Sequence, residues 1–253
     1  MEFLTLERDE ATAILTMNRG KANALNGDML GEIREALDEL NVNDEVNAIV
    51  LASASPKFFS SGFDVGEVFS YDRDAMGEFF GTFMDLYEYM MRYPKPIVAA
   101  MPGHAFAGGA ILALTCDARI FGEGQYGFAL NEVNLGIVLT PGVIRMASAI
   151  MGDRVARQLI LGGATLSAED AVACGLGDKL VAPDALLDEA KKAAESLGKK
   201  PSQAFAAIKG LLADEWGFPD NDAHREFLET FLDHWFSDEC VGARQALVNS
   251  MKK

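Results

Sequence analysis

The sequence predicts a mixed α/β fold in which strands and crossover helices come first and a helical part follows. Three observations carry this prediction. In the first 140 residues, short apolar runs typical of buried strands alternate with segments of helical periodicity. Two Gly-bearing turns, at 58–64 and 103–111, each follow a strand-like run and open a helix-like run. After Pro141 strand signals nearly vanish, except at 179–181, and helical periodicity dominates.

The first third of the chain supplies most of the strand signals. Residues 3–6 and 13–17 are interpreted as two short strands around a polar turn, and a loop over 18–26 follows. Asn26-Gly27-Asp28 then marks the start of a helix. Its apolar residues are spaced to share one face: Met29, Leu30, Ile33, Leu37 and Leu40. Residues 48–52 form a compact apolar run, which indicates a buried strand.

Asp64 stands where a helix N-cap is needed, so we interpret it as a cap rather than as a catalyst. A Met- and aromatic-rich helix over 76–93 follows, and Pro94 and Pro96 end it. Its Met and Phe stripe fits core packing better than the lining of an acyl pocket. The next elements are expected at 97–101 (strand), 103–114 (turn and helix) and 118–121 (strand).

The helical part is expected to contain six runs, at 146–161, 167–174, 185–197, 202–214, 222–235 and 239–251. No internal repeat, low-complexity tract or long linker interrupts the sequence. The alternation does not show which strands pair, nor whether the core is a flat sheet or a spiral. Apolar residues on the last helices exceed what one helical hairpin should bury: Phe227, Leu228, Phe231, Leu232, Trp235 and Phe236. They either join subunits or close over the chain's own core.

Composition excludes several classes of partner. The chain has 253 residues, 49% of them hydrophobic, and a net charge of −16. Such acidity argues against binding to nucleic acid or to an anionic membrane, since both need a basic face. Any anionic ligand must find local positive charge, for which the candidates are Arg19, Lys21, Lys57 and the terminal Lys252-Lys253.

The cysteines point to no disulfide or zinc site. Cys116, Cys174 and Cys240 cannot form a closed disulfide framework, and their spacing matches no zinc pattern. We therefore expect reduced, mostly buried thiols and no metal. Neither a leader with a basic and an apolar region nor a long apolar run is evident, so a cytoplasmic protein without membrane insertion is expected.

The two Gly-bearing turns have a chemical meaning. Gly permits positive φ and leaves neighbouring backbone N–H groups uncovered by a side chain. The first turn of a helix also carries unpaired donors and the positive end of the dipole. Two such turns that face one point would form a hole for an oxyanion. Glu132, within an otherwise apolar segment, would be a proton shuttle if it lay near that hole.

These segments resemble the crotonase, or enoyl-CoA hydratase/isomerase, superfamily over nearly the whole chain. The segments that carry the resemblance, in order and at matching separations, are 18–26, 59–64, 103–110, 164–171 and 175–181. The resemblance implies a spiral of ββα units over residues 1–195, with the CoA and oxyanion sites, and a C-terminal helical trimerisation region over 196–253. It also implies trimers, often paired into hexamers, and acyl-CoA thioester substrates. No cofactor is implied beyond the coenzyme A of the substrate.

Carried onto this sequence, the family's motifs assign roles to particular residues. The oxyanion donors would be the backbone N–H groups of Phe63 and Gly108. The substrate's CoA part would meet the segments around four residues: Lys21, Ala22, Ala24 and Ser61. Hydratases of the family carry two glutamates, of which one matches Glu132 and the other falls on Ile111. Phe63 and Ile111 would thus adjoin the reacting part of the substrate.

The missing carboxylate decides the expected reaction. Adding water to a double bond needs a base for the water and an acid for the α-carbon, whereas moving a double bond needs one base that returns its proton. An apolar Ile111 would also keep water out. The segments 113–120 and 130–137 are similar to those of Δ3,Δ2-enoyl-CoA isomerases. We therefore expect an isomerase of 3-enoyl-CoA thioesters in fatty-acid degradation, with Glu132 as base.

Two other functions stay open at this point. One is an enoyl-CoA hydratase or another single-acid reaction of the same superfamily. The other is a catalytically silent protein of this fold that serves in an assembly, against which the intact Gly62, Gly108 and Glu132 argue. His104, close to the second turn, is expected to be a packing residue. Asn131 and Asn134 could either orient Glu132 or hydrogen-bond a loop.

Overall fold

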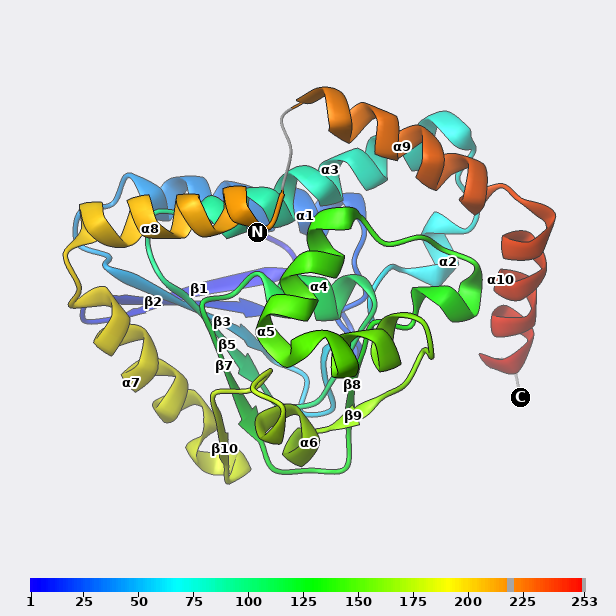
Figure 1. Ribbon diagram of the computed structural model, residues 1–253. Helices are drawn as coiled ribbons and strands as arrows, with labels where there is room; N and C mark the ends of the chain where they lie inside the picture. The colour runs from blue at the N-terminus through cyan, green and yellow to red at the C-terminus, as the bar shows by residue number, and fades with distance from the viewer. Residues whose placement is uncertain (218–220, 252–253) are drawn as a thin grey trace.

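The computed structural model describes residues 1–217 and 221–251. Lys252 and Lys253, two of the cations considered for an anionic ligand, lie outside the described residues. The described chain forms two sheets surrounded by helices (Figure 1).

The larger sheet has six strands in the order β1-β2-β3-β5-β7-β10. Its strands are β1 (Leu4–Asp9), β2 (Thr12–Met17), β3 (Ala48–Ser53), β5 (Ile97–Met101), β7 (Ala118–Gly122) and β10 (Lys179–Val181). β1 and β2 are antiparallel, and every pairing from β2 to β10 is parallel. Leu15 pairs with Leu51, which pairs with Ala99 on the next strand. The expected strands of this sheet are thus confirmed.

The smaller sheet has four short strands in the order β4-β6-β8-β9. They are β4 (Phe58–Ser60), β6 (His104–Phe106), β8 (Gly127–Ala129) and β9 (Leu166–Ser167). β4, β6 and β8 are parallel, whereas β9 is antiparallel to β8. The sequence did not predict these strands. β4 and β6 lie within the segments interpreted as Gly-bearing turns, and β8 and β9 are too short to show a strand periodicity there.

The chain winds as a spiral between the two sheets. β3 and β4, β5 and β6, and β7 and β8 are successive pairs that each give one strand to each sheet, and helices follow each pair. Those helices are α2 (Val65–Val68), α3 (Arg73–Arg92), α4 (Gly108–Leu114), a 3-10 turn (Glu132–Leu135) and α5 (Pro141–Ile160). The expected ββα spiral is confirmed. Its regular winding brings the chain past β4, β6 and β8 at neighbouring points of the small sheet.

The remaining helices pack on the sheets or on other helices. They are α1 (Gly27–Asn41), α6 (Ala168–Ala173), a 3-10 turn (Pro183–Ala185), α7 (Leu186–Gly198), α8 (Ser202–Glu215), α9 (Asn221–Trp235) and α10 (Asp238–Met251). α7 packs on the large sheet through Ala190 and Ala194, beside Val50 and Val98. In Figure 1, α9 runs along the end of α3, and α10 lies at the side away from α7.

The aromatic residues of α9 close over the chain's own core. The Phe231 ring stacks on Phe80 of α3 with centroids 3.5 Å apart, and Trp235 meets Phe69 edge-on at 5.6 Å. Phe231, Leu232 and Trp235 are buried, whereas Phe236 is 36% exposed. The apolar surplus that the sequence analysis offered as support for an oligomer is therefore largely used within one chain.

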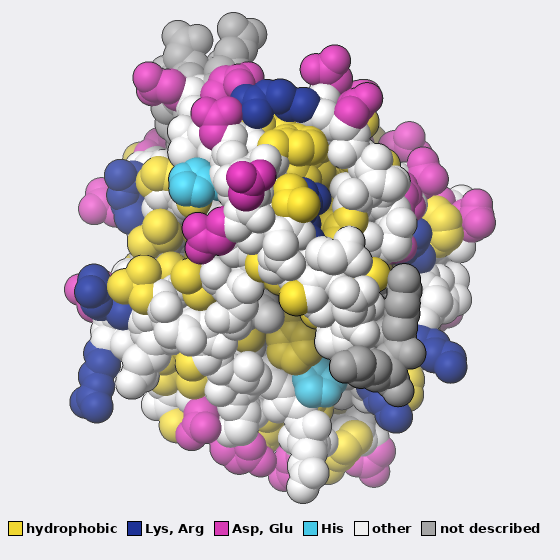
Figure 2. All heavy atoms as spheres, turned by 90° about the vertical axis from the view of Figure 1, so that its right-hand side faces the viewer, with side chains coloured by type: hydrophobic (Ala, Val, Ile, Leu, Met, Phe, Trp, Pro, Cys, Tyr) yellow, Lys and Arg dark blue, Asp and Glu magenta, His cyan; other side chains and the backbone are white. Residues whose placement is uncertain are grey.

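On the face that Figure 2 shows, acidic side chains are widespread, while Lys and Arg are scattered towards the edges. None of the helices in residues 1–217 and 221–251 combines the length and apolar character of a membrane span. The cysteines are free, with Cys116 and Cys240 buried and Cys174 half-buried, as expected.

Candidate active site

The two Gly-bearing turns lie against each other. Gly62 has φ +86°, and a Cβ at this position would lie 2.8 Å from the Phe106 carbonyl oxygen and 3.4 Å from the Gly108 nitrogen. A Cβ on Gly108 would lie 2.9 Å from the Phe63 ring. Gly62 is required by its positive φ and by the closeness of the Phe106 carbonyl, whereas a side chain on Gly108 would displace the Phe63 ring. The pairing of β4 with β6 thus brings together two turns that are far apart in the sequence.

The first turn directs the Phe63 amide away from its neighbouring strand segment. Leu25 pairs with Phe63 as an isolated parallel bridge. In this bridge the Leu25 N–H donates to the Gly62 carbonyl at 2.8 Å, and the Asp64 N–H donates to the Leu25 carbonyl at 2.8 Å. The residues on either side of Phe63 therefore make the bonds, and the N–H of Phe63 itself points to the other side.

The second turn presents the first amides of a buried helix. Gly108 is the first residue of α4, whose first-turn N–H groups lack partners within the helix. Ala107 before it has φ +47°, an unfavourable conformation for a residue with a Cβ. Its N–H donates to the Ala129 carbonyl at 2.9 Å, which ties the turn to β8. The strained residue thus leads the chain abruptly from β6 into α4.

Glu132 brings a buried carboxyl group to the same region. It is the first residue of the 3-10 turn after β8 and is 5% exposed. Neither carboxyl oxygen has a hydrogen-bond partner among the described residues. Burial raises the pKa of Glu132 to about 7, and its own backbone amide opposes this only weakly. The carboxyl group is therefore poised to gain or lose a proton near neutral pH.

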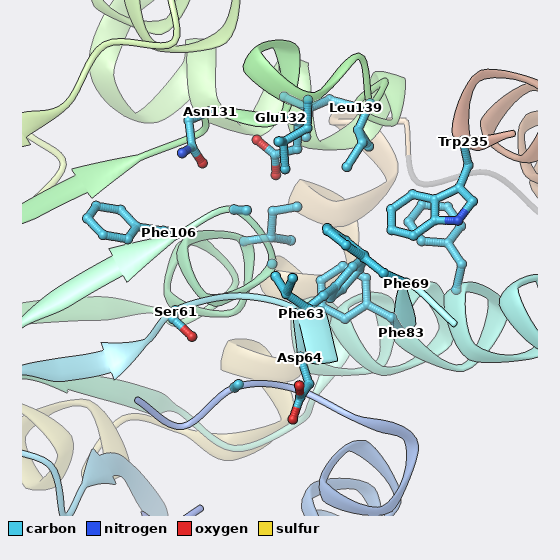
Figure 3. A pocket seen from close by; sticks show the side chains of 18 of the residues that line it. Ser61, Phe63, Asp64, Phe69, Phe83, Phe106, Asn131, Glu132, Leu139 and Trp235 are labelled. Atoms are coloured by element: carbon cyan, nitrogen blue, oxygen red, sulfur yellow. The ribbon is translucent and has the colours of Figure 1, made fainter. Parts of the chain in front are cut away.

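A cavity of about 460 Å³ joins these features. Its lining is mainly aromatic and aliphatic and includes Phe63, Phe69, Phe80, Phe83, Phe106, Leu139 and Trp235. In Figure 3, Ser61 and Phe106 lie towards one end and Trp235 and Phe69 towards the other, with Glu132 and Phe63 between them. Such a long apolar cavity with few polar groups suits a ligand that carries a hydrocarbon chain.

Most of the residues expected at the site meet at this cavity. Ala22, Ala24, Ser61, Phe63, Gly108, Ile111 and Glu132 all line it. Lys21 is not among the lining residues. Its side chain is exposed and its carbonyl accepts from Ser55 Oγ at 2.6 Å. The spiral thus collects a site from four separate segments that the sequence analysis could identify only by resemblance.

Asp64 is the other carboxylate in the lining, and it is engaged elsewhere. Its Oδ1 accepts from the N–H of Gly66 at 2.9 Å, which confirms its role as the N-cap of α2. Its Oδ2 pairs with Arg19 at 2.6 Å. Arg19 is therefore directed inwards to a carboxylate rather than free for an anionic ligand, which corrects one expectation from the sequence.

The positions of His104, Asn131 and Asn134 decide between the roles considered for them. His104 Nδ1 accepts from the N–H of Gly127 at 3.0 Å, and its ring packs between aromatic neighbours, so the packing role is confirmed. Asn131 lines the cavity, whereas the side chain of Asn134 lies against Gly163, 2.5 Å from where a Cβ would be. Only Asn131 is thus placed to meet a ligand.

The far end of the cavity was not predicted from the sequence. Tyr87, Thr140 and Trp235 line it, and the Tyr87 hydroxyl donates to Thr140 Oγ1 at 3.1 Å. The Met and Phe stripe of α3 contributes Phe80 and Phe83, so it serves both the core and the cavity. No motif marks these residues, because they come from α3, the start of α5 and α9, which are far apart in the sequence.

Comparison with known proteins identifies the family. The model of the family described as enoyl-CoA hydratase/isomerase matches residues 7–244. The chain belongs to the enoyl-CoA hydratase/isomerase family. It is 32% identical to a crotonyl-CoA hydratase of Syntrophomonas wolfei over 84% of each chain. It is 34% identical to a short-chain-enoyl-CoA hydratase of Clostridium acetobutylicum, over 81% of this chain and 77% of that one.

A structural comparison supports the fold of this family member. The human mitochondrial Δ3,Δ2-enoyl-CoA isomerase superposes with a TM-score of 0.93 at 22% identity, over 99% of this chain and 98% of that one. At this identity the likeness shows a shared fold. The expected crotonase fold is therefore confirmed, and an enoyl-CoA hydratase/isomerase family enzyme acting on acyl-CoA is established at that level.

Proposed function

We propose that the protein is a Δ3,Δ2-enoyl-CoA isomerase that shifts the double bond of 3-enoyl-CoA thioesters to the trans-2 position, within fatty-acid degradation. The proposal rests on how many carboxylates in the cavity lining are available to act as a base. Of the two acidic side chains in the described lining, Asp64 is committed to a helix cap and an arginine, and Glu132 has no partner. By the family resemblance, Ile111 falls where hydratases carry their second glutamate, which supports the proposal.

In the proposed mechanism Glu132 moves one proton. Its carboxylate removes a proton from C2 of the substrate, and the electron pair delocalises onto the thioester oxygen. The N–H groups of Phe63 and Gly108 would stabilise the negative charge on that oxygen. The Glu132 carboxyl then returns the same proton to C4, which leaves the double bond between C2 and C3. A pKa of about 7 makes Glu132 a stronger base than an ordinary carboxylate, while part of it is still ionised at neutral pH.

The surroundings of Glu132 favour this reaction over addition of water. Ile111 and Leu139 line the cavity beside the proposed dienolate and supply no group that could hold or activate a water molecule. The CoA part would enter along Lys21, Ala22, Ala24 and Ser61, and the acyl chain would extend towards Trp235. Because the proton removed is also the proton returned, the proposed chemistry needs no metal and no cofactor beyond the substrate's coenzyme A.

Hydration is the second candidate, and the names of the relatives favour it. Both the Syntrophomonas and the Clostridium proteins are named as hydratases, and each is more than 30% identical to this chain. A hydratase would need a second group to activate or position water. Asn131 is the remaining polar side chain of the segment around Glu132 that lines the cavity, and an amide cannot act as a base at neutral pH.

Two assays on the purified protein separate these candidates. One follows conversion of 3-hexenoyl-CoA to trans-2-hexenoyl-CoA, and the other follows hydration of crotonyl-CoA. We expect isomerisation with a kcat/KM well above that of hydration. Hydration at an equal or greater rate would refute the isomerase assignment and leave the family membership intact. Turnover of neither substrate would favour another acyl-CoA reaction or a silent member.

A further inference from the structure

Arg19 joins two segments that both line the cavity. Its Nη1 donates to the Ala24 carbonyl at 2.8 Å and to Asp64 Oδ2 at 2.6 Å. Its Nη2 lies 3.4 Å from Glu67 Oε2. One guanidinium group therefore holds the loop after β2 against the turn between β4 and α2. Both ends of the connection are partly buried, with side-chain exposures of 18% for Arg19 and 24% for Asp64.

The contacts of Arg19 are made to residues that adjoin the Phe63 amide and its bridge to Leu25. Ala24 immediately precedes Leu25, whose N–H and carbonyl bond to Gly62 and Asp64. Asp64 immediately follows Phe63. Arg19 thus fixes the carbonyl next to Leu25 and the side chain next to Phe63 at once. The Gly62 carbonyl, which belongs to the same peptide unit as the Phe63 N–H, accepts from the Leu25 N–H. The Leu25 N–H in turn belongs to the peptide unit whose Ala24 carbonyl binds Arg19, so a shift of either Arg19 contact would rotate the unit that carries the Phe63 N–H.

The partners of Arg19 are themselves anchored. Asp64 Oδ1 accepts from the N–H of Gly66, while Glu67 accepts from Asn26 Nδ2 at 3.0 Å and from the Tyr71 hydroxyl at 2.6 Å. Arg19 therefore binds to a rigid cluster rather than to mobile surface carboxylates. A planar guanidinium suits this task because its donors point in fixed directions.

The hydrogen bonding of Arg19 itself is incomplete. Its Nε is buried and has no partner among the described residues. A buried donor without a partner lowers the stability of the folded protein. Arg19 makes its hydrogen bonds to Ala24 and Asp64 although its Nε is left without a partner. This indicates that the geometry of the turn matters more than complete hydrogen bonding of Arg19.

We infer that Arg19 is a positioning residue, which aims the Phe63 N–H at the thioester oxygen through Ala24 and Asp64. This inference rests on the oxyanion role of Phe63 in the proposed function. Arg19 touches no substrate atom in this account. Its loss should weaken polarisation of the thioester carbonyl without removing the acyl cavity, so turnover should fall more than binding.

Infrared spectroscopy of a bound, unreactive thioester tests this directly. We would record the carbonyl stretch of hexanoyl-CoA, labelled with ¹³C at the carbonyl, free and bound to wild-type protein and to Arg19→Met. Wild-type protein should lower the stretching frequency, and Arg19→Met should lose most of that shift. With 3-hexenoyl-CoA, kcat should fall by roughly 10–100-fold while KM stays within about threefold, as expected for a displaced oxyanion donor.

Two further variants serve as controls. Arg19→Lys keeps the charge but not the fork, and it should recover part of the carbonyl shift. Arg73 is a matched arginine that also pairs with two carboxylates, Glu229 and Asp233, at 2.8 Å each, but on the surface. Arg73→Met should keep the full shift and wild-type turnover. Thermal unfolding of each variant identifies any that fail to fold.

The outcomes separate this inference from the proposed function. A full carbonyl shift in folded Arg19→Met would show that Arg19 is purely structural, and the inference would be rejected. The absence of any shift in wild-type protein would instead refute the oxyanion assignment itself, and the positioning role with it. Because hexanoyl-CoA does not react, the result does not depend on whether the enzyme isomerises or hydrates.

Discussion

Glu132 is the residue on which the proposed chemistry depends. We predict that Glu132→Gln keeps binding of acyl-CoA and loses about 10²–10⁴-fold in kcat, because the amide preserves the shape but cannot accept a proton. Turnover of 3-hexenoyl-CoA and calorimetric binding of hexanoyl-CoA would measure the two effects. Turnover at the wild-type level in this variant would place the base on another residue.

The buried carboxyl group also predicts a pH dependence. Its pKa is about 7 in the folded protein and about 4.5 when unfolded, so the folded state holds more protons between these values. Activity should therefore rise with pH through about 7, as Glu132 becomes a carboxylate. Stability should change in the opposite direction, since ionising the buried group costs on the order of 3 kcal/mol by pH 8.

Glu132→Gln supplies the control for that linkage. Denaturant unfolding of both proteins at pH 5 and pH 8 should show the variant gaining stability relative to wild type as pH rises. An equal difference between the two proteins at both pH values would mean that Glu132 titrates normally. The glutamine carries no titrating group, so any pH dependence that it retains comes from other residues.

Ile111 separates the two candidate reactions. We predict that Ile111→Glu loses isomerase activity and gains measurable hydration of crotonyl-CoA. Ile111 is buried on the first turn of α4 and lines the cavity with Glu132, so a carboxylate there could hold a water molecule. The gain should be small because no neighbouring group is arranged to support it. Unchanged isomerisation in the folded variant would remove the main argument against a hydratase.

At the scale of single residues, local chemistry predicted the helix caps, and the family resemblance predicted residues of the site. The caps Asn26 and Asp64 were predictable from their side-chain chemistry, and both accept the expected backbone hydrogen bonds. Glu132 and Ile111 were found through resemblance, because nothing in a single sequence shows that distant segments share a cavity. Arg19 was misread as a free cation because its partners lie some 45 residues further along the chain.

At the scale of elements, every strand of the large sheet was predicted and those of the small sheet were not. The five- and six-residue strands have apolar runs long enough to recognise, and the three-residue β10 stood out against its helical surroundings. The strands of the small sheet have three residues or fewer and were missed, although they carry the oxyanion turns. Their pairing comes from the spiral winding, which is a property of the whole chain.

α9 supplies the far wall of the cavity, and Trp235 is its largest contribution. We predict that Trp235→Leu raises kcat/KM for longer 3-enoyl-CoA chains relative to 3-hexenoyl-CoA, because a smaller side chain leaves room for added methylenes. Each methylene in an apolar pocket is worth roughly 10-fold or more in discrimination. A series of chain lengths would measure the shift.

Phe236 offers the matched control for this test. It is the neighbouring aromatic residue, but it is 36% exposed and does not line the cavity. Phe236→Leu should leave the chain-length preference unchanged. The same preference in Trp235→Leu and wild type would show that the acyl chain does not extend towards α9.

For the whole molecule, the outstanding prediction is the oligomeric state. Most of the apolar tail residues pack within one chain, although Phe236 is 36% exposed, so α8 offers the better surface for a contact between subunits. Ile208, Leu211 and Leu212 share an exposed face, and Leu211 is 67% exposed. On the opposite face, Lys209 is buried and pairs with Asp117 at 2.7 Å. α8 is thus anchored on one side and leaves an unusually apolar surface on the other.

We predict a trimer, or a hexamer built from two trimers, with α8 in the contact between subunits. Light scattering at micromolar protein should give three or six times the mass of one chain. Leu211→Glu should shift this mass towards one chain, because a buried unpaired carboxylate is costly at an interface. Leu187→Glu, at a 41% exposed leucine on α7, is the matched control and should not. A monomeric wild-type mass would reject the oligomer, and an intact oligomer in folded Leu211→Glu would place its contacts elsewhere.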